Sequence, residues 1–217
     1  MNWDWLARNA SEITSWTLAH VLLSGVPTVV GLILSIPLGA LASRYRWAYP
    51  PTVTIAGLLY TIPSIALFVL LPGILGTGIL DPINVIVALT LYTVALMVRT
   101  VADALTAVPP DVRQAAVAMG YRPLRRLITV ELPVAIPVIG AGLRVAAVSN
   151  VSLVAVAALI GVPQLGQLFT QGQQLDFYTP IVAGIVLCAA IAVVFDAIIL
   201  STVKLATPWR RLGRAAA

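Results

Sequence analysis

Ionisable side chains inside long apolar runs are the residues of this sequence best placed to do chemistry. Arg144 and Asp196 each stand among valine, alanine, leucine and isoleucine. Charges in such surroundings are rare and mark either function or a buried pair. We expect a structural pair or a cavity-facing position here, rather than direct substrate contact. Arg99 and Asp103 are four residues apart, so a local ion pair on one helix face is expected rather than a gate.

Aromatic and small polar side chains form a second group within the apolar runs. Tyr60 and Tyr92 could meet an organic cation through a cation–π contact, or could simply pack against lipid and neighbouring helices. Ser149, Asn150 and Ser152 could line a polar pathway, or could hydrogen-bond across helices. The sequence alone leaves both alternatives open.

The sequence offers little evidence for a catalytic or metal-binding site. The chain has one histidine, His20, and one cysteine, Cys188, and we expect both to be packing residues. A single cysteine excludes an internal disulfide and any multi-cysteine metal site. The sequence contains no Ser/His/Asp constellation, no pair of catalytic carboxylates and no GxxxxGK[ST] phosphate loop. We therefore expect no catalytic residue, no metal and no cofactor.

The composition is that of an integral membrane protein. Of 217 residues, 60% are hydrophobic and only 10% are charged, whereas about a quarter are charged in soluble domains. We predict an all-α polytopic membrane protein with about five transmembrane helices in one transmembrane domain, residues 17–203. The spans are expected at about 17–42, 52–71, 83–105, 134–160 and 180–203.

The segments around these spans have their own character. Residues 1–16 include Trp3, Trp5 and Trp16, which suit an interfacial segment. Pro27 and Pro37 are expected to interrupt the first span. Residues 72–82 and 161–179 are expected to be loops, and residues 204–217 a basic tail.

The basic residues are distributed asymmetrically about the predicted spans. With five spans, the basic residues of one side are Arg44, Arg46, the four arginines of residues 109–133, and Lys204, Arg210, Arg211 and Arg214 of the tail. The other side has only Arg8, against Asp4, Glu12, Asp81 and Asp176. The positive-inside rule places the N-terminus outside and the basic side in the cytoplasm. The net charge of +5 is then explained without a nucleic-acid partner.

Residues 109–133, PPDVRQAAVAMGYRPLRRLITVELP, form a basic, amphipathic insert between the third and fourth spans. Asp111 and Gln114 have the spacing of a capping box. Gly120 is placed to end a first short helix, and Pro123 to open a second. The first helix is expected to carry one apolar stripe, made by Val112, Ala115, Ala116 and Met119.

This insert resembles the EAA loop of permease subunits of ATP-binding-cassette importers. The matching positions are Ala115, Ala116, Gly120, Leu132 and Pro133, with Gln114 in place of the usual glutamate and Val130 in place of isoleucine. Residues 61–78, 91–105 and 142–166 are similar to the branch that imports glycine betaine, carnitine or choline.

The resemblance implies a subunit in the inner or plasma membrane of a bacterial-type cell. It implies three kinds of partner besides lipid: a cytoplasmic ATPase dimer, a second permease subunit (identical or homologous) and an extracytoplasmic binding protein. The insert would be a pair of coupling helices on the ATPase, through Val112, Gln114, Ala115, Ala116, Met119, Gly120, Leu132 and Pro133. Tyr60, Tyr92, Ser149 and Asn150 become candidate pathway residues.

Other interpretations remain. The insert could be a surface helix pair lying on anionic lipid headgroups. The chain could belong to a permease for another small solute, such as an amino acid or an organic sulfonate. It could also be a self-sufficient channel or secondary transporter, which would need no ATPase.

Overall fold

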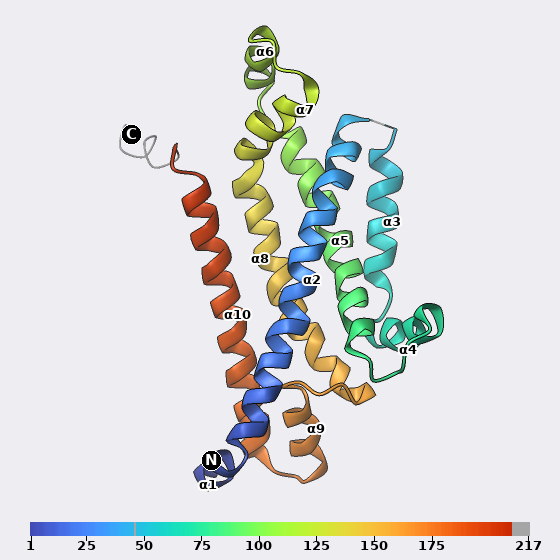
Figure 1. Ribbon diagram of the computed structural model, residues 1–217, viewed down its shortest axis with the longest axis vertical. Coiled ribbons are helices and arrows are strands. Elements are labelled where there is room, and N and C mark those ends of the chain that lie inside the picture. The colour runs from blue at the N-terminus through green and yellow to red at the C-terminus, as the bar shows by residue number, and fades with distance from the viewer. Residues whose placement is uncertain (46, 210–217) are drawn as a thin grey trace.

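The computed structural model describes residues 1–45 and 47–209, and every regular element in this part of the chain is helical (Figure 1). The all-α fold is therefore confirmed. Long helices run side by side, and shorter ones cap both ends. The helices are α1 (Trp3–Arg8), α2 (Ala10–Arg44), α3 (Tyr49–Thr61), α4 (Ser64–Leu75), α5 (Pro82–Thr106), α6 (Pro110–Ala118), α7 (Pro123–Arg126), α8 (Leu132–Val156), α9 (Gln167–Gln174) and α10 (Tyr178–Ala206), with a π-helical turn η1 (Leu127–Glu131) and a 3₁₀ turn η2 (Ala157–Ile160).

Four helical stretches are long and apolar enough to cross a membrane. They are Ala10–Arg44, Pro82–Thr106, Pro123–Ile160 and Tyr178–Ala206. A fifth crossing is obtained if α3 and α4, which meet at an angle of 100°, count as one broken span. The described residues thus provide the predicted number of spans, one of them in an unexpected shape.

Helix α2 is longer and more regular than predicted. It begins at Ala10, so only α1 is separate from the first span, and residues 10–16 are part of that span. Pro27 and Pro37 lie inside the helix without interrupting it, contrary to our expectation. Each proline removes one backbone hydrogen bond, but the turns on either side can keep theirs and remain packed against neighbouring helices.

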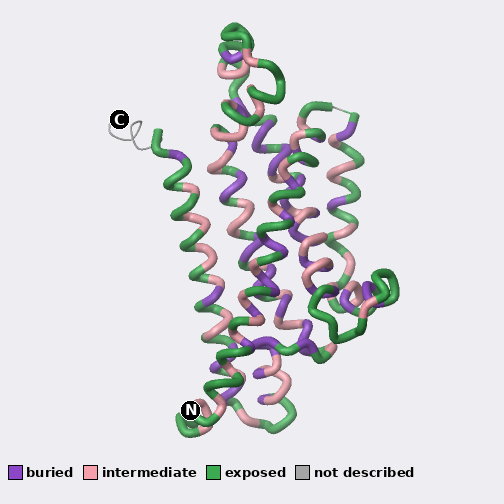
Figure 2. Tube along the Cα trace, viewed as in Figure 1, coloured by how far each residue is buried: buried purple, intermediate pink, exposed green. Residues whose placement is uncertain are grey.

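Helix α5 is the centre of the bundle. In the most apolar 18-residue stretch of α5, 56% of the residues are buried. The corresponding share for α10 is 17%, and α10 lies at the edge of the bundle (Figure 2). Helix α2 approaches α5 closely through two glycines. A Cβ atom at Gly31 would lie 2.4 Å from the Cγ2 atom of Thr93, and one at Gly39 would lie 2.6 Å from the Cβ atom of Val101. Small residues at such contacts are typical of helix packing in membranes.

The second span is broken, and the prediction of one continuous helix over 52–71 was wrong. Helix α3 ends before Ile62, whose backbone is extended (φ −67°, ψ 128°), and α4 starts after Pro63. The proline ring disfavours helical geometry at the preceding residue. The Tyr92 hydroxyl of α5 donates a hydrogen bond to the freed Ile62 carbonyl. Helix α4 consequently lies crosswise to the long helices, at the side of the bundle beside the lower part of α5 (Figure 1).

The connections at the α1 and α9 end are more structured than expected. The predicted loop 72–82 begins with the last turn of α4, and its Asp81 caps α5 by accepting a hydrogen bond from the Ile83 amide at 2.9 Å. The predicted loop 161–179 contains α9. Gln164 is fully buried beside His20, which anchors this connection to α2.

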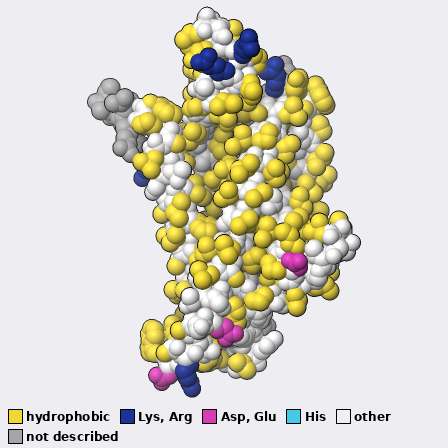
Figure 3. Space-filling model, in the orientation of Figure 1, with side chains coloured by type: hydrophobic (Ala, Val, Ile, Leu, Met, Phe, Trp, Pro, Cys, Tyr) yellow, Lys and Arg dark blue, Asp and Glu magenta, His cyan; other side chains and the backbone are white. Residues whose placement is uncertain are grey.

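On the face drawn in Figure 3, Lys and Arg side chains gather at the end of the bundle formed by α6 and α7, and the Asp and Glu side chains in view lie toward the opposite end, where one basic side chain is also seen. Arg44 ends α2 at the α6–α7 end, and the N-terminus lies at the other end (Figure 1). Arg46, Arg210, Arg211 and Arg214, which also entered the orientation argument, lie outside the described residues. The sidedness itself stays a prediction.

Candidate functional site

Helix α6 begins without the predicted capping box. It starts at Pro110, so Asp111 lies inside its first turn, and no side chain caps it. Proline suits the first helical position because the amide hydrogen it lacks would have no partner there. Asp111 can still favour the helix start electrostatically. Gln114 is exposed and does not reach back to the helix start.

Gly120 ends α6 as predicted. Its φ is +77°, in the left-handed region that favours glycine. The Gly120 amide donates to the Val117 carbonyl at 2.9 Å, and the Tyr121 amide donates to the Ala116 carbonyl at 3.1 Å. These two bonds form a Schellman motif, which turns the chain sharply toward α7.

The four side chains of the predicted apolar stripe of α6 do not all point to the same side of the helix. Ala116 is fully buried and Val112 partly buried, so these two pack α6 onto the rest of the chain. Ala115 and Met119 are exposed, together with Val117, which the prediction omitted. The outward surface of α6 is therefore shifted around the helix from the expected one, because the inner part of the stripe is used for packing within the chain.

The second helix of the insert begins at Pro123 but does not end before the fourth span. Helix α7 continues through η1 into α8, so this helical stretch starts at Pro123, about three helical turns before the predicted 134. Leu132 and Pro133 are thus the first residues of α8, and both are partly buried. We call residues 109–131 the arm.

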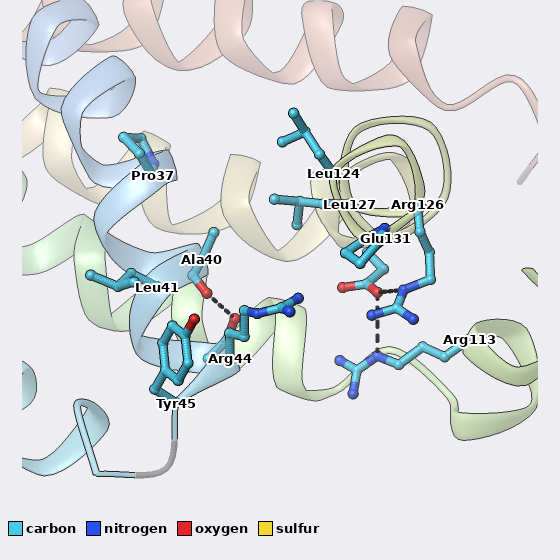
Figure 4. Close-up of a pocket in the computed structure, with 12 residues that line it drawn as sticks. Pro37, Ala40, Leu41, Arg44, Tyr45, Arg113, Leu124, Arg126, Leu127 and Glu131 are labelled. Carbon is cyan, nitrogen blue, oxygen red and sulfur yellow. Dashed lines mark hydrogen bonds and ion pairs between the residues drawn. The ribbon is translucent and has the colours of Figure 1, made fainter. Parts of the chain in front are cut away.

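Glu131 joins the two halves of the arm, and sequence reasoning missed it. Its Oε1 atom lies 2.6 Å from the Arg126 Nε and 3.9 Å from the Arg113 Nε (Figure 4). Arg113 also donates to the Leu105 carbonyl near the end of α5. Residues five apart meet in a π turn, since that turn pairs i with i+5. A glutamate beside an apolar span, with arginines nearby, was the available signal.

The four candidate pathway residues lie together. Tyr60, Tyr92, Ser149 and Asn150 line one cavity of about 10 Å³, in which the two tyrosine rings meet edge to face at 5.7 Å. The cavity has no room for a solute. Asn150 donates to Thr28 at 2.9 Å and to Thr93 at 2.8 Å, so it connects α8 with α2 and α5. Of the two roles left open for Asn150, the hydrogen-bonded one is observed. Ser152 is exposed.

The charged pairs form as expected. Arg99 lies 3.6 Å from Asp103, which also accepts a hydrogen bond from Tyr49 at 2.6 Å. Arg144 binds Asp196 through both carboxylate oxygens, at 2.5 and 2.9 Å, and so joins α8 to α10. These contacts give both pairs a structural role.

His20 occupies a buried polar junction. Its Nδ1 atom lies 3.1 Å from the Gln164 side chain, and its Nε2 atom lies 3.0 Å from the Val151 carbonyl. The Cys188 sulfur is 4.0 Å from Nε2. The ring therefore connects α2, α8, α10 and the segment before α9, which is the packing role expected of both residues.

The chain is similar in sequence to membrane components of known transport systems. A family model described as "Binding-protein-dependent transport system inner membrane component" matches residues 22–207. The osmoprotectant import permease protein OsmW of Salmonella typhimurium is 36% identical over 87% of this chain and 88% of that protein. The choline transport system permease protein OpuBB of Bacillus subtilis is 28% identical over 94% of this chain and 93% of that protein.

Among solved structures, a chain of the MetNI methionine ABC transporter in an inward-facing conformation has the same fold. It superposes with a TM-score of 0.80 at 22% identity, covering 92% of this chain and 98% of that one. At this identity the likeness concerns the fold alone.

Proposed function

This chain belongs to the family of binding-protein-dependent transport system inner membrane components, and we propose that it is the permease subunit that carries a quaternary-amine osmoprotectant, of the glycine betaine, carnitine or choline type, into the cell. The observation that supports the substrate class most is the 36% identity, across nearly the whole chain, to a permease named for osmoprotectant import. The similarity to a choline permease supports the same class.

As an inner membrane component, the chain works with an ATPase and a substrate-binding protein. ATP hydrolysis belongs to the ATPase in our proposal, since these 217 residues contain no GxxxxGK[ST] loop. A second permease subunit, identical or homologous, completes the pathway. The N-terminus, α4 and α9 face the binding protein, and the α6–α7 end faces the cytoplasm, as the positive-inside rule favours.

The arm couples the permease to the ATPase. The outward side chains of α6, Gln114, Ala115 and Met119, contact the ATPase groove, and Gly120 sets the angle between α6 and α7. Ala116 and Val112 hold α6 on the bundle from the other side, and Leu132 and Pro133 carry its displacement into α8. The open polar side chain of Gln114 favours a hydrogen-bonded contact, because it lacks the charge of a glutamate.

The pathway passes beside the aromatic pair of Tyr60 and Tyr92. An aromatic face attracts a quaternary ammonium without needing a counter-charge. Tyr60 is about half exposed, while Tyr92 is nearly buried and is held by its hydrogen bond to Ile62. In this proposal the small cavity between them widens when α3 and α5 separate, and Ser149 then lines it.

Reconstitution tests this function. The chain is placed in liposomes with its ATPase and binding protein, and uptake of radiolabelled glycine betaine, carnitine and choline is measured against methionine. We expect uptake of at least one quaternary amine that stops when the ATPase carries an inactive phosphate loop. Uptake that continues with the inactive ATPase would indicate a self-sufficient transporter. ATP-driven uptake of methionine alone would contradict the substrate class and keep the permease role.

A further inference from the structure

A basic cavity opens between the end of α2 and the arm (Figure 4). Its volume is about 590 Å³, and its charged lining consists of Arg44, Arg113, Arg126 and Glu131. Three arginines against one glutamate leave a net charge of +2. We call it the arginine cavity. Its charge makes it attractive to an anion.

The arginines retain unused hydrogen-bonding capacity. Arg44 forms no ion pair with any residue that the structure describes. The Arg113 Nε atom is buried and has no hydrogen-bond partner among the described residues, because Glu131 at 3.9 Å is too distant. A buried unpaired donor is costly, and guanidinium groups bind phosphate through paired hydrogen bonds. A phosphate group in the cavity would supply acceptors to the guanidinium groups of Arg44 and Arg113 where they line it, although the buried Arg113 Nε atom itself is out of its reach.

An apolar groove lies near the arginine cavity, on the part of α2 and α8 that spans the membrane. It has a volume of about 410 Å³ and is lined almost entirely by hydrocarbon, from α2, α8 and α10. Ile36 of the groove precedes Pro37 of the cavity, and Leu132 of the groove follows Glu131 of the cavity. The two spaces are therefore consecutive along the seam between α2 and α8.

Aromatic side chains mark the depth of the cavity. Tyr45 lines it and lies 6.3 Å, ring to ring, from Trp47, which is 77% exposed. Exposed tyrosine and tryptophan at the end of a span are typical of the level of lipid headgroups. These aromatic residues favour headgroup level for the cavity, which leaves the groove at acyl-chain level.

We propose that this composite site binds one anionic phospholipid. The phosphate lies in the arginine cavity, on Arg44 and Arg113, and one acyl chain lies in the groove beside Ile36 and Ile136. A soluble phosphate would use the cavity alone and would leave the groove empty. A lipid uses both, which is why we commit to it. The bound lipid connects α2 to the arm. The proposal does not depend on the transported solute.

The test is lipid binding to the purified full chain in neutral detergent, measured by native mass spectrometry. The probes are phosphatidylglycerol, phosphatidylcholine with the same acyl chains, and sn-glycerol 3-phosphate. We expect phosphatidylglycerol to bind tightest. Arg44→Gln should weaken its binding about tenfold, the loss expected for a charge-assisted hydrogen bond. Arg122→Gln, an exposed arginine of the arm outside the cavity, should leave binding unchanged.

Ile136→Trp, which fills the groove, should weaken phosphatidylglycerol without affecting glycerol phosphate. Circular dichroism and gel filtration are used to check that the variants are folded. Arg44→Lys keeps the charge but loses the guanidinium fork, so its loss of binding should be smaller. It replaces Arg44→Gln if that variant is misfolded. Three outcomes would overturn the proposal: equal binding of phosphatidylcholine, equal losses in Arg44→Gln and Arg122→Gln, or displacement of the lipid by an equal concentration of glycerol phosphate.

Discussion

Arg144 of α8 and Asp196 of α10 face each other in a bidentate ion pair, with Nε 2.5 Å from Oδ1 and Nη2 2.9 Å from Oδ2. Helix α10 is the least buried of the spanning helices, so this pair is a main polar attachment of α10 to the bundle. Both residues lie in apolar spans, where a lone charge is costly.

We expect Asp196→Leu to lower the free energy of unfolding, because Arg144 then remains in an apolar span without its partner. The double variant Arg144→Leu/Asp196→Leu should regain most of this loss, since two apolar side chains are tolerated in the same place. Unfolding of the purified chain in mixed micelles measures both. A double variant as unstable as the single one would contradict the ion-pair explanation.

Gly39→Ala should destabilise the contact between α2 and α5. The added Cβ would lie 2.6 Å from Val101 and 2.9 Å from the Val98 carbonyl, and the backbone cannot give way easily. Overpacking of this kind costs about 1–3 kcal/mol. Gly57→Ala is the matched control, because its Cβ meets nothing within 4 Å. Equal unfolding of the two variants would count against the close packing.

Gly120→Val should uncouple ATP hydrolysis from transport while leaving the spans assembled. A Cβ at Gly120 meets nothing within 4 Å, so the effect comes from the backbone, whose φ of +77° disfavours a branched residue by about 1–2 kcal/mol. Gly120→Asn should remain coupled, because asparagine tolerates this conformation. The ratio of ATP hydrolysed to solute transported measures coupling. Normal coupling in the valine variant would contradict the proposal that Gly120 acts as a hinge between α6 and α7.

Glu131→Gln should loosen α6. The substitution removes the charge that Arg126 and Arg113 share, and we expect amide hydrogen exchange in α6 to become about fivefold faster, equivalent to about 1 kcal/mol for a partly exposed pair. Asp176→Asn, the same change at an exposed acid outside the arm, is the control. Equal exchange in both variants would show that Glu131 does not hold the arm.

Tyr60→Ala should raise the KM for a quaternary amine about fivefold, the loss of a cation–π contact, whereas Tyr60→Phe should change it little. ATP-driven uptake in liposomes measures both. If Tyr60→Phe and Tyr60→Ala are equally impaired, the aromatic face is not the relevant feature.

Much of the fold follows from local sequence. Apolar length alone located the spans that start near Pro82 and Tyr178, and Gly120 was correctly assigned to the end of α6 because its chemistry is local. The bend after Ile62 was missed, although Pro63 was visible, since other prolines such as Pro27 and Pro37 leave a helix intact. Whether a proline breaks a span depends on its packing against other helices.

The arm shows where such reasoning stops. Ala116 and Met119 share a periodic stripe, yet only the fold decides that one faces the bundle and the other the solvent. The capping box failed because Pro110 starts the helix one residue before Asp111. Arg113 and Glu131 are far apart in sequence, and Arg126 and Glu131 are five apart, a spacing that ordinary helices do not bring together. The contact between Arg113 and Glu131 is tertiary, so its geometry cannot be read from a local pattern.

The π turn Leu127–Glu131 has a consequence for how the chain tolerates changes of length. A π turn holds one residue more than an α turn. Deleting one residue there can convert it to an α turn and leave α7 pointing as before. Deleting one residue in the middle of α8 would rotate the arm by about 100° around the helix axis. The extra residue of the π turn therefore allows the chain to lose one residue at this position without changing the direction of the arm.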